Sequence, residues 1–175
     1  MKKYTFSTSI TKRDSNLSWT HLIEVPFNIC AQLIENGSEG NKKRVFCEVN
    51  KKVKYQCALM PNGNGTHVIM FSKTNRKKAD IEHILEFEVC LWNDVSEYGI
   101  EFPIEMKEVL AQDDLGNDFF QKLTPGKQRS LIHLVNKPKS EALRIEKTFV
   151  ILEHLKRNKG KLDMRMLHED FKIGF

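Results

Sequence analysis

Apolar and polar residues alternate along much of the first half of the chain, as they do in strands that bury one face. The first such stretch runs from Lys3 to Ile10, and the residues that would share its buried face are Tyr4, Phe6, Thr8 and Ile10. Alternation or short apolar runs predict further strands at residues 19–25, 45–49, 53–59, 68–71 and 85–91. The front of the chain therefore contains about six short predicted strands.

The segments between these strands carry helix and turn signals. Phe27–Glu35 repeats apolar side chains at helical spacing, and Asn36-Gly37 follows as a helix end. Asn50–Lys52 is short enough to close a hairpin, and the glycines of Pro61–Gly65 suit a second reversal. Lys73–Lys78 is a charged stretch that we expect to be a loop. Short strands separated by such turns are typical of a small antiparallel barrel or split barrel.

Beyond Tyr98 the apolar residues recur at the period of helices that bury one stripe. Pro103 and Thr124-Pro125 mark helix starts, and Pro138 and Gly160 lie at helix ends. The expected apolar stripes are Met106, Val109 and Leu110; Phe119, Phe120 and Leu123; Leu131, Ile132, Leu134 and Val135; Ala142, Ile145, Phe149 and Leu152; and Met164, Met166, Leu167 and Phe171. The sequence thus predicts an α+β protein, with a β-barrel domain at residues 1–96 and a helical segment at 97–175 that packs on or beside it.

Charge is distributed unevenly along the chain. Lys and Arg number 28 against 23 Asp and Glu, a net charge of +5. From Val95 to Asp118 there is one basic residue against seven acidic ones, whereas from Phe119 to Lys161 there are 11 against three. One interpretation is that the acidic and basic helices pack together and neutralise each other in part. The other is a basic face that binds phosphate or another acidic ligand.

The basic residues are the one feature of the sequence that points to a ligand. The candidate residues for binding an anion or a nucleic acid are Arg76, Lys77, Lys78, Lys127, Arg129 and Arg144. If these side chains share a face, their summed potential would attract phosphate groups. If they are scattered, they serve solubility. The sequence has little of the aromatic interleaving that is used to stack bases.

The sequence contains no recognisable catalytic or metal-binding motif. No two of the six histidines fall at the i, i+4 spacing of a zinc helix, and no serine lies in a Gly-x-Ser-x-Gly turn. The glycines on either side of Asn64 lack the lysine and hydroxyl of a nucleotide loop. Asp113 and Asp114 suit a helix start better than a calcium loop. We therefore expect no cofactor and no metal.

Cysteine usage and hydropathy bear on the compartment. Cys30, Cys47, Cys57 and Cys90 form no Cys-x-x-Cys pair and lie in apolar surroundings, so we expect buried free thiols. The first ten residues lack the apolar run of a signal peptide, and no run of about 18 apolar residues occurs. These features predict a cytoplasmic protein that does not span a membrane. Both a monomer and a homodimer are compatible with the predicted barrel.

Parts of the sequence resemble a known family. The segments Phe102–Leu110, Phe119–Arg129, Asn136–Pro138 and Arg144-Ile145 are similar to the YdeI/OmpD-associated family, also called bacteriocin-protection proteins. The preceding part is similar to a domain of unknown function that often precedes that family's domain. Its matching features are Trp19, Val25-Pro26, Gln56–Pro61, the turn at Gly63 and Gly65, and Arg76–Lys78.

This resemblance implies a double-split β-barrel followed by a helical segment. The same barrel class is found in transition-state regulators and in antitoxins that bind DNA, and the resemblance brings no known catalytic residue. Where many relatives carry an arginine-rich Glu-Thr-Arg signature, this chain has Lys139–Arg144 and keeps only the last arginine. We therefore expect a non-enzymatic binding, stress-protection or bacteriocin-protection module. A nucleic-acid-binding regulator and an enzyme with an unrecognised pocket are the alternatives.

Overall fold

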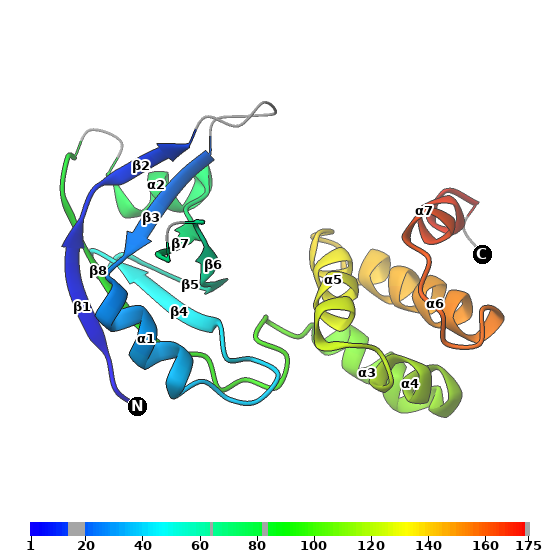
Figure 1. Cartoon of the computed structure of the whole chain (residues 1–175). Coiled ribbons are helices and arrows are strands. Elements are labelled where there is room, and N and C mark those ends of the chain that lie inside the picture. The colour runs from blue at the N-terminus through cyan, green and yellow to red at the C-terminus, as the bar shows by residue number, and fades with distance from the viewer. Residues whose placement is uncertain (14–19, 64, 82–83, 174–175) are drawn as a thin grey trace. The chain divides into compact units, whose positions relative to one another are not determined.

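The computed structural model describes residues 1–13, 20–63, 65–81 and 84–173. The chain divides into two compact units, Met1–Gly99 and Ile100–Phe175 (Figure 1). Unit 1 contains the strands with two short helices, and unit 2 contains the other described helices. The predicted α+β class, with strands ahead of helices, is therefore confirmed.

The strands of unit 1 form two antiparallel sheets. Sheet A has the spatial order β1 (Tyr4–Thr8), β8 (Phe87–Asn93), β4 (Arg44–Val49) and β5 (Val53–Ala58). Sheet B has the order β2 (Ile10–Arg13), β3 (Thr20–Val25), β7 (His67–Met70) and β6 (Met60–Pro61). Helix α1 (Phe27–Glu35) joins β3 to β4, as its apolar spacing predicted, and helix α2 (Lys73–Ala79) follows β7.

The first predicted strand is in fact two strands in different sheets. β1 ends at Thr8 and β2 begins at Ile10, so the chain passes from sheet A to sheet B at Ser9. A strand that switches sheets in this way makes a corner between packed sheets. Together with the short strand β6, this split gives eight described strands where the pattern predicted about six. The pairings of the described strands form two sheets, and the double-split barrel stays a prediction.

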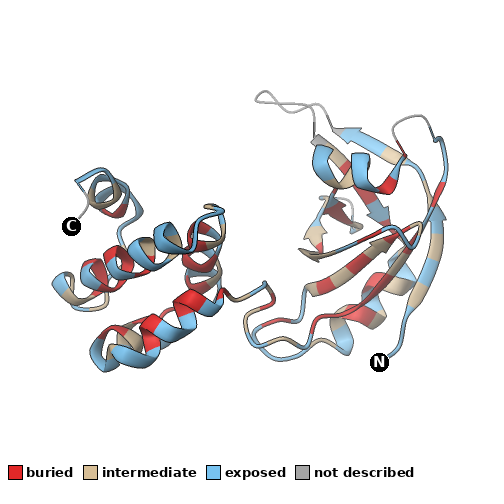
Figure 2. Cartoon of the chain, turned by 180° about the vertical axis from the view of Figure 1, so that it is seen from behind, coloured by how far each residue is buried: buried red, intermediate tan, exposed pale blue. Residues whose placement is uncertain are grey.

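Alternate side chains of both sheets meet in the core of unit 1, where red buried segments run along the strands in Figure 2. The fully buried core residues include Ile23, Val45, Cys47, Val49, Ile69, Val89 and Leu91. Cys30 and Leu33 add the buried face of α1. Tyr55 of sheet A stacks on Phe71 beside sheet B, with ring centroids 5.9 Å apart. This aromatic contact helps to hold the sheets together.

Both predicted reversals are present. Asn50 and Lys51 take positive φ values of 49° and 55° in the turn between β4 and β5. The Asn50 Oδ1 accepts a hydrogen bond from the backbone N of Glu88 at 2.9 Å, which ties this turn to β8. Gly63 and Gly65 have positive φ between β6 and β7, while Asn64 lies outside the described residues.

Two further sequence predictions in unit 1 differ from the structure, and one other is not tested by it. Trp19, expected in a strand, lies outside the described residues. β8 starts at Phe87, two residues later than predicted, and Leu85 is 90 % exposed. The expected loop at Lys73–Lys78 is helix α2. Ser72 Oγ accepts from the backbone N of Asn75 at 3.2 Å and caps the start of α2. A capped helix this short and polar shows no apolar period, so the pattern missed it.

Unit 2 is built around one long helix. Its helices are α3 (Ile104–Gln112), α4 (Asp114–Gln121), α5 (Pro125–Asn136), α6 (Glu141–Arg157) and α7 (Met164–Ile173). Helix α6 contacts each of the other four. The stripes predicted for α3 and α5 are buried as expected. Among the described helices, none is both long and apolar enough to cross a membrane.

The buried stripe predicted for α6 is wrong at three of its four positions, and of the four only Leu152 is buried as expected. Ile145 and Phe149 are 37 % and 43 % exposed, whereas the structure buries Thr148, Ile151, Leu152, His154 and Leu155. Thr148 is tolerated there because its Oγ1 donates to the backbone O of Arg144 at 2.8 Å. Polar residues with satisfied hydrogen bonds thus occupy part of the packed face, and the spacing of apolar residues alone could not locate it.

Candidate anion-binding site

The six predicted site residues lie on three helices. Arg76, Lys77 and Lys78 share α2 in unit 1. Lys127 and Arg129 share α5 in unit 2, where Arg144 lies on α6. The structure therefore brings the first three together and the next two together.

Helix α2 starts beside strand β3. The backbone N of Phe71 donates to the backbone O of His21 at 3.0 Å, immediately before the cap residue Ser72. Lys12 of β2 is the cross-strand partner of His21. We call the resulting group the basic end of unit 1, and it comprises Lys12, His21, Lys73, Arg76, Lys77 and Lys78.

The electrostatics of His21 reflect this crowding of positive charge. Burial, then the charges of Arg76 and Lys12, lower the pKa of His21 below its usual value. The imidazole is therefore mainly neutral at pH 7. Because Arg76 and Lys12 both act on this ring, they contribute to one positive potential at the end of the sheet.

Arg76 has a donor without an acceptor. Its Nε is buried and has no hydrogen-bond partner among the described residues. Leaving a buried guanidinium N–H unpaired is unfavourable, and an anion beside it would supply the missing acceptor. Lys77 and Lys78 are exposed, while the neighbouring carboxylate of Asp80 pairs with Lys52 at 3.2 Å.

Sequence reasoning selected Arg76 but missed Lys12 and His21. Their proximity depends on the register of β2 against β3, and the alternation pattern does not give the register between two strands. In the sequence alone, Lys12 lies two residues beyond the first alternating stretch, and nothing there pairs it with His21.

Arg144 is held inside unit 2. Its Nη1 donates to Glu105 Oε1 at 3.0 Å and its Nε donates to the backbone O of Pro138 at 3.0 Å. Lys127 is exposed, while Arg129 is half-buried and burial lowers its pKa. Of these three side chains, Lys127 is the most accessible to a ligand.

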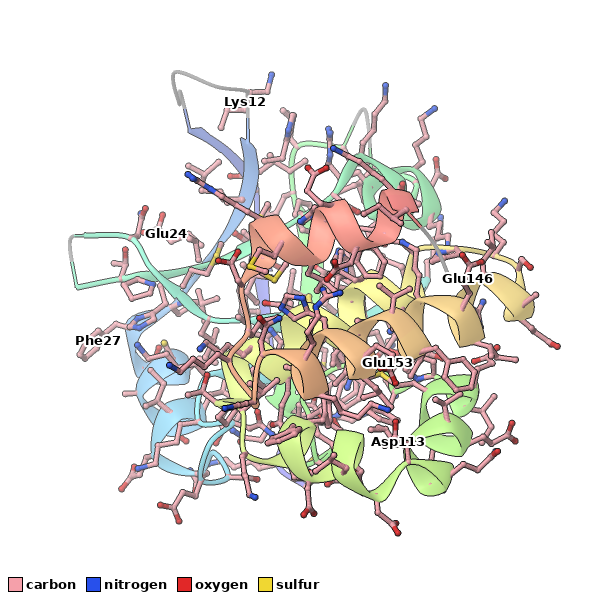
Figure 3. All side chains as sticks on the ribbon, turned by 90° about the vertical axis from the view of Figure 1, so that its right-hand side faces the viewer. Lys12, Glu24, Phe27, Asp113, Glu146 and Glu153 are labelled. Atoms are coloured by element: carbon pink, nitrogen blue, oxygen red, sulfur yellow. The ribbon has the colours of Figure 1, made fainter. Side chains whose placement is uncertain are left out.

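The acidic and basic segments of unit 2 are joined by ion pairs. Arg144 binds Glu105, and Lys156 Nζ lies 2.8 Å from Asp113 Oδ2 and also pairs with Glu153. Figure 3 labels Asp113, at the start of α4, near Glu153 on α6. The hydrogen bond from Lys156 lowers the pKa of Asp113. These contacts support the interpretation that the two segments neutralise each other in part.

A second polar cluster, at the end of sheet A, is satisfied internally. The buried Asp94 accepts from Gln56 Nε2 at 2.7 Å. Its other oxygen accepts from the backbone N of Ser96 at 2.9 Å and from the Ser96 Oγ at 2.6 Å. Arg44 donates to the backbone O of Gly99. These bonds fasten residues 94–99 to the sheet.

Metal ligands and reactive thiols do not form an obvious centre. Within the part of the chain that the structure describes, no group of three or more His, Cys, Asp and Glu could hold a metal ion. All four cysteines are free. Cys30 and Cys47 are buried as predicted, whereas Cys57 and Cys90 are only half-buried.

The class of protein defined by these observations is an α+β protein in which a strand-built unit with a basic end precedes a helical unit. Residues 6–83 match the family model described as Domain of unknown function (DUF1905). Residues 100–158 match the model described as Bacteriocin-protection, YdeI or OmpD-Associated. The chain therefore contains a domain of the YdeI/OmpD-associated family preceded by a DUF1905 domain, and the resemblance stated from the sequence is confirmed. Comparison with curated proteins and with solved structures found no match.

Proposed function

We propose that this protein is a non-enzymatic binding module that acts in bacteriocin or stress protection and holds a phosphate-bearing ligand at the basic end of unit 1. The observation that carries this proposal is the meeting of Lys12, His21 and Arg76, with a buried Arg76 donor that lacks an acceptor. The description of the family matched at residues 100–158 supports the protective role.

Phosphate suits this group of side chains better than a neutral ligand does. The guanidinium of Arg76 offers directed N–H donors. The exposed Lys77 and Lys78 add positive charge on flexible side chains, which can adjust to the position of a phosphate group. An anion beside His21 would raise the pKa of this ring from its lowered value. Binding should therefore strengthen as the pH falls and the imidazole gains a proton.

The test is a calorimetric titration of the full chain with inorganic tripolyphosphate. We expect binding that weakens as salt is raised, and a loss of about tenfold in the Lys77→Gln/Lys78→Gln double variant. The matched control is Lys137→Gln/Lys139→Gln, which removes two exposed lysines from unit 2. Absence of binding at low salt, or an equal loss in the control, would refute the proposal.

A nucleic-acid-binding regulator is the second candidate function. Such a regulator binds a polyanion, and the double-split barrel that the family resemblance implies is a class also found in proteins that bind DNA. We propose that sheets A and B together form such a barrel. The sheet switch at Ser9 supports this, as does Tyr55, which stacks on Phe71 and whose hydroxyl lies 3.5 Å from the backbone O of Met70.

The four free thiols support a reducing compartment, and we propose the cytoplasm. The oligomeric state stays a prediction, with a monomer and a homodimer as the two possibilities. Sedimentation of the full chain distinguishes them.

A further inference from the structure

The outer face of sheet A carries a stacked aromatic pair. Phe46 of β4 and Trp92 of β8 are direct cross-strand partners. Their ring centroids are 5.6 Å apart with an interplanar angle of 18°. Val45 and Cys47 on either side of Phe46 face the core, so Phe46 and its partner lie on the opposite side of the sheet.

Two lysines from either side of this pair place their ammonium groups over the rings. Lys3, just before β1, has its Nζ 4.5 Å from the centroid of Trp92. Lys54 of β5 has its Nζ 4.6 Å from the centroid of Phe46 and 5.2 Å from that of Trp92. We call Lys3, Phe46, Lys54 and Trp92 the aromatic platform. β1 and β5 are the outer strands of sheet A (Figure 1). The two lysines therefore flank the rings.

The lysine heads are a replaceable cover for these rings. Both lysines are exposed, Phe46 is half-buried, and Trp92 is 7 % exposed beneath its neighbours. An exposed cation–π contact is weaker than the stacking of a nucleic-acid base on an aromatic side chain. A base can therefore take the place of an ammonium group, and the long lysine stems allow the displaced charges to meet the flanking phosphates.

The platform lies next to the proposed phosphate site. Helix α2 contacts β5, and the pair between Lys52 and Asp80 joins the β4–β5 turn to the end of α2. A strand leaving the platform past Lys54 would thus reach the charges of α2. Glu48, the cross-strand partner of Lys54, limits the net charge of the platform itself. Stacking should therefore supply more of its affinity than charge does.

From this arrangement we propose that unit 1 binds single-stranded nucleic acid, with bases stacked on Phe46 and Trp92 and with phosphates at Lys3, Lys54 and the basic end. This inference deepens the proposed function and depends on it for the phosphate contacts. A single strand is specified because bases in a duplex are already stacked and cannot lie on the rings.

The experiment uses a short oligothymidylate, and the tryptophan fluorescence of the full chain is the readout. A Trp19→Phe background leaves Trp92 as the one remaining tryptophan of the two. We expect saturable quenching of Trp92 by the single strand. The added Phe46→Leu substitution keeps an apolar side chain and should weaken this binding about tenfold. The matched control is Phe27→Leu, because Phe27 is a 71 % exposed ring that projects from the start of α1 (Figure 3).

Comparison of ligands separates the two proposals. The Lys77→Gln/Lys78→Gln variant should bind all three ligands more weakly: the single strand, a duplex of the same length and tripolyphosphate. The Phe46→Leu variant should bind only the single strand more weakly. A folded Phe46→Leu protein that binds oligothymidylate like its background, or unchanged Trp92 fluorescence on binding, would overturn the stacking proposal. Quenching by the single strand without any binding of tripolyphosphate would instead refute the proposed phosphate site.

The Lys3→Gln/Lys54→Gln double substitution, which keeps both rings, provides a second variant. We expect it to bind the single strand more weakly and with a shallower salt dependence.

Discussion

Arg144 on α6 and Glu105 on α3 form an ion pair in unit 2, with 3.0 Å between Nη1 and Oε1. The Glu105 side chain is 7 % exposed, and its second oxygen is buried without a hydrogen-bond partner among the described residues. Arg144 also donates to the backbone O of Pro138 and so fixes the connection between α5 and α6. Arg144, one of the six candidate binding residues, thus has a clear structural task.

Replacing Arg144 by alanine should destabilise unit 2. The change leaves the Glu105 carboxylate buried without its cation and frees the backbone O of Pro138. We expect the free energy of unfolding to fall by about 2 kcal/mol, because the partly exposed arginine makes this less than a fully buried pair. Urea unfolding followed by circular dichroism measures the change. Lys139→Ala, an exposed neighbour, is the control, and an unchanged midpoint for Arg144→Ala would contradict the structural role.

Gly116 of α4 packs closely against α6. A Cβ at this position would lie 2.9 Å from Asp113 Cγ and 3.0 Å from Leu152 Cβ. Gly116→Val should therefore destabilise unit 2 by about 1–3 kcal/mol through overpacking. Gly126→Ala on α5 is the matched control, because a Cβ there meets nothing within 4 Å, and it should raise stability by about 0.5 kcal/mol. Thermal unfolding of both variants checks the contrast, and equal melting temperatures would disprove it.

The sequence predicted the helices and strands of this fold better than the way in which they pair and pack. The α1 stripe, the β4–β5 hairpin and the helix starts at Pro103 and Pro125 follow from local spacing and turn chemistry. The sheet switch at Ser9 does not, because β1 and β2 read as one alternating stretch until their pairing separates them. The buried face of α6 was misplaced since Thr148 and His154 enter it with satisfied hydrogen bonds.

The same limit applies to the candidate sites. Arg76, Lys77 and Lys78 are adjacent in sequence and could be selected as a group. The approach of Lys12 to His21, and of Phe46 to Trp92, is a consequence of strand register. For this reason the sequence appeared poor in aromatic interleaving, although the fold stacks two rings that are far apart in the chain.

Acid should weaken unit 2 through Asp113. The hydrogen bond from Lys156 keeps the pKa of Asp113 below its usual 3.8, so the folded state favours the charged form. The resulting stabilisation is fully present above the pKa of an unfolded aspartate, and it is lost as the pH falls through the lowered folded value. The stability difference between the natural protein and Asp113→Asn should therefore shrink below about pH 4. Urea unfolding at several pH values measures it.

Asp118→Asn is the control for this pH experiment, because Asp118 is exposed on the same helix. We expect the free energy of unfolding of Asp118→Asn to stay close to that of the natural protein at every pH. A constant difference for Asp113→Asn down to pH 2 would contradict the assigned role of the carboxylate.

The turn between β4 and β5 stores strain at Lys51. Its φ of 55° lies in the left-handed region, which glycine adopts without a Cβ clash. Lys51→Gly should raise the free energy of unfolding by up to about 1 kcal/mol, whereas Lys51→Ala should leave it nearly unchanged. Asn50 is unsuitable for the same test, because its Oδ1 accepts from Glu88. A Lys51→Gly variant that is no more stable than Lys51→Ala would show that the strain is negligible.

His154 fastens α7 to α6. Its buried ring has Nδ1 2.7 Å from Asp170 Oδ2, and its Nε2 accepts from the backbone N of Asp163 at 3.3 Å, which places the proton on Nδ1. His154→Ala removes both contacts, so the backbone amides of α7 should exchange with solvent about 10- to 100-fold faster. The amides of α5 should change far less. His133→Ala, an exposed histidine on α5, is the control. Uniform acceleration across unit 2 would mean that His154 stabilises the whole helical unit and not the attachment of α7 alone.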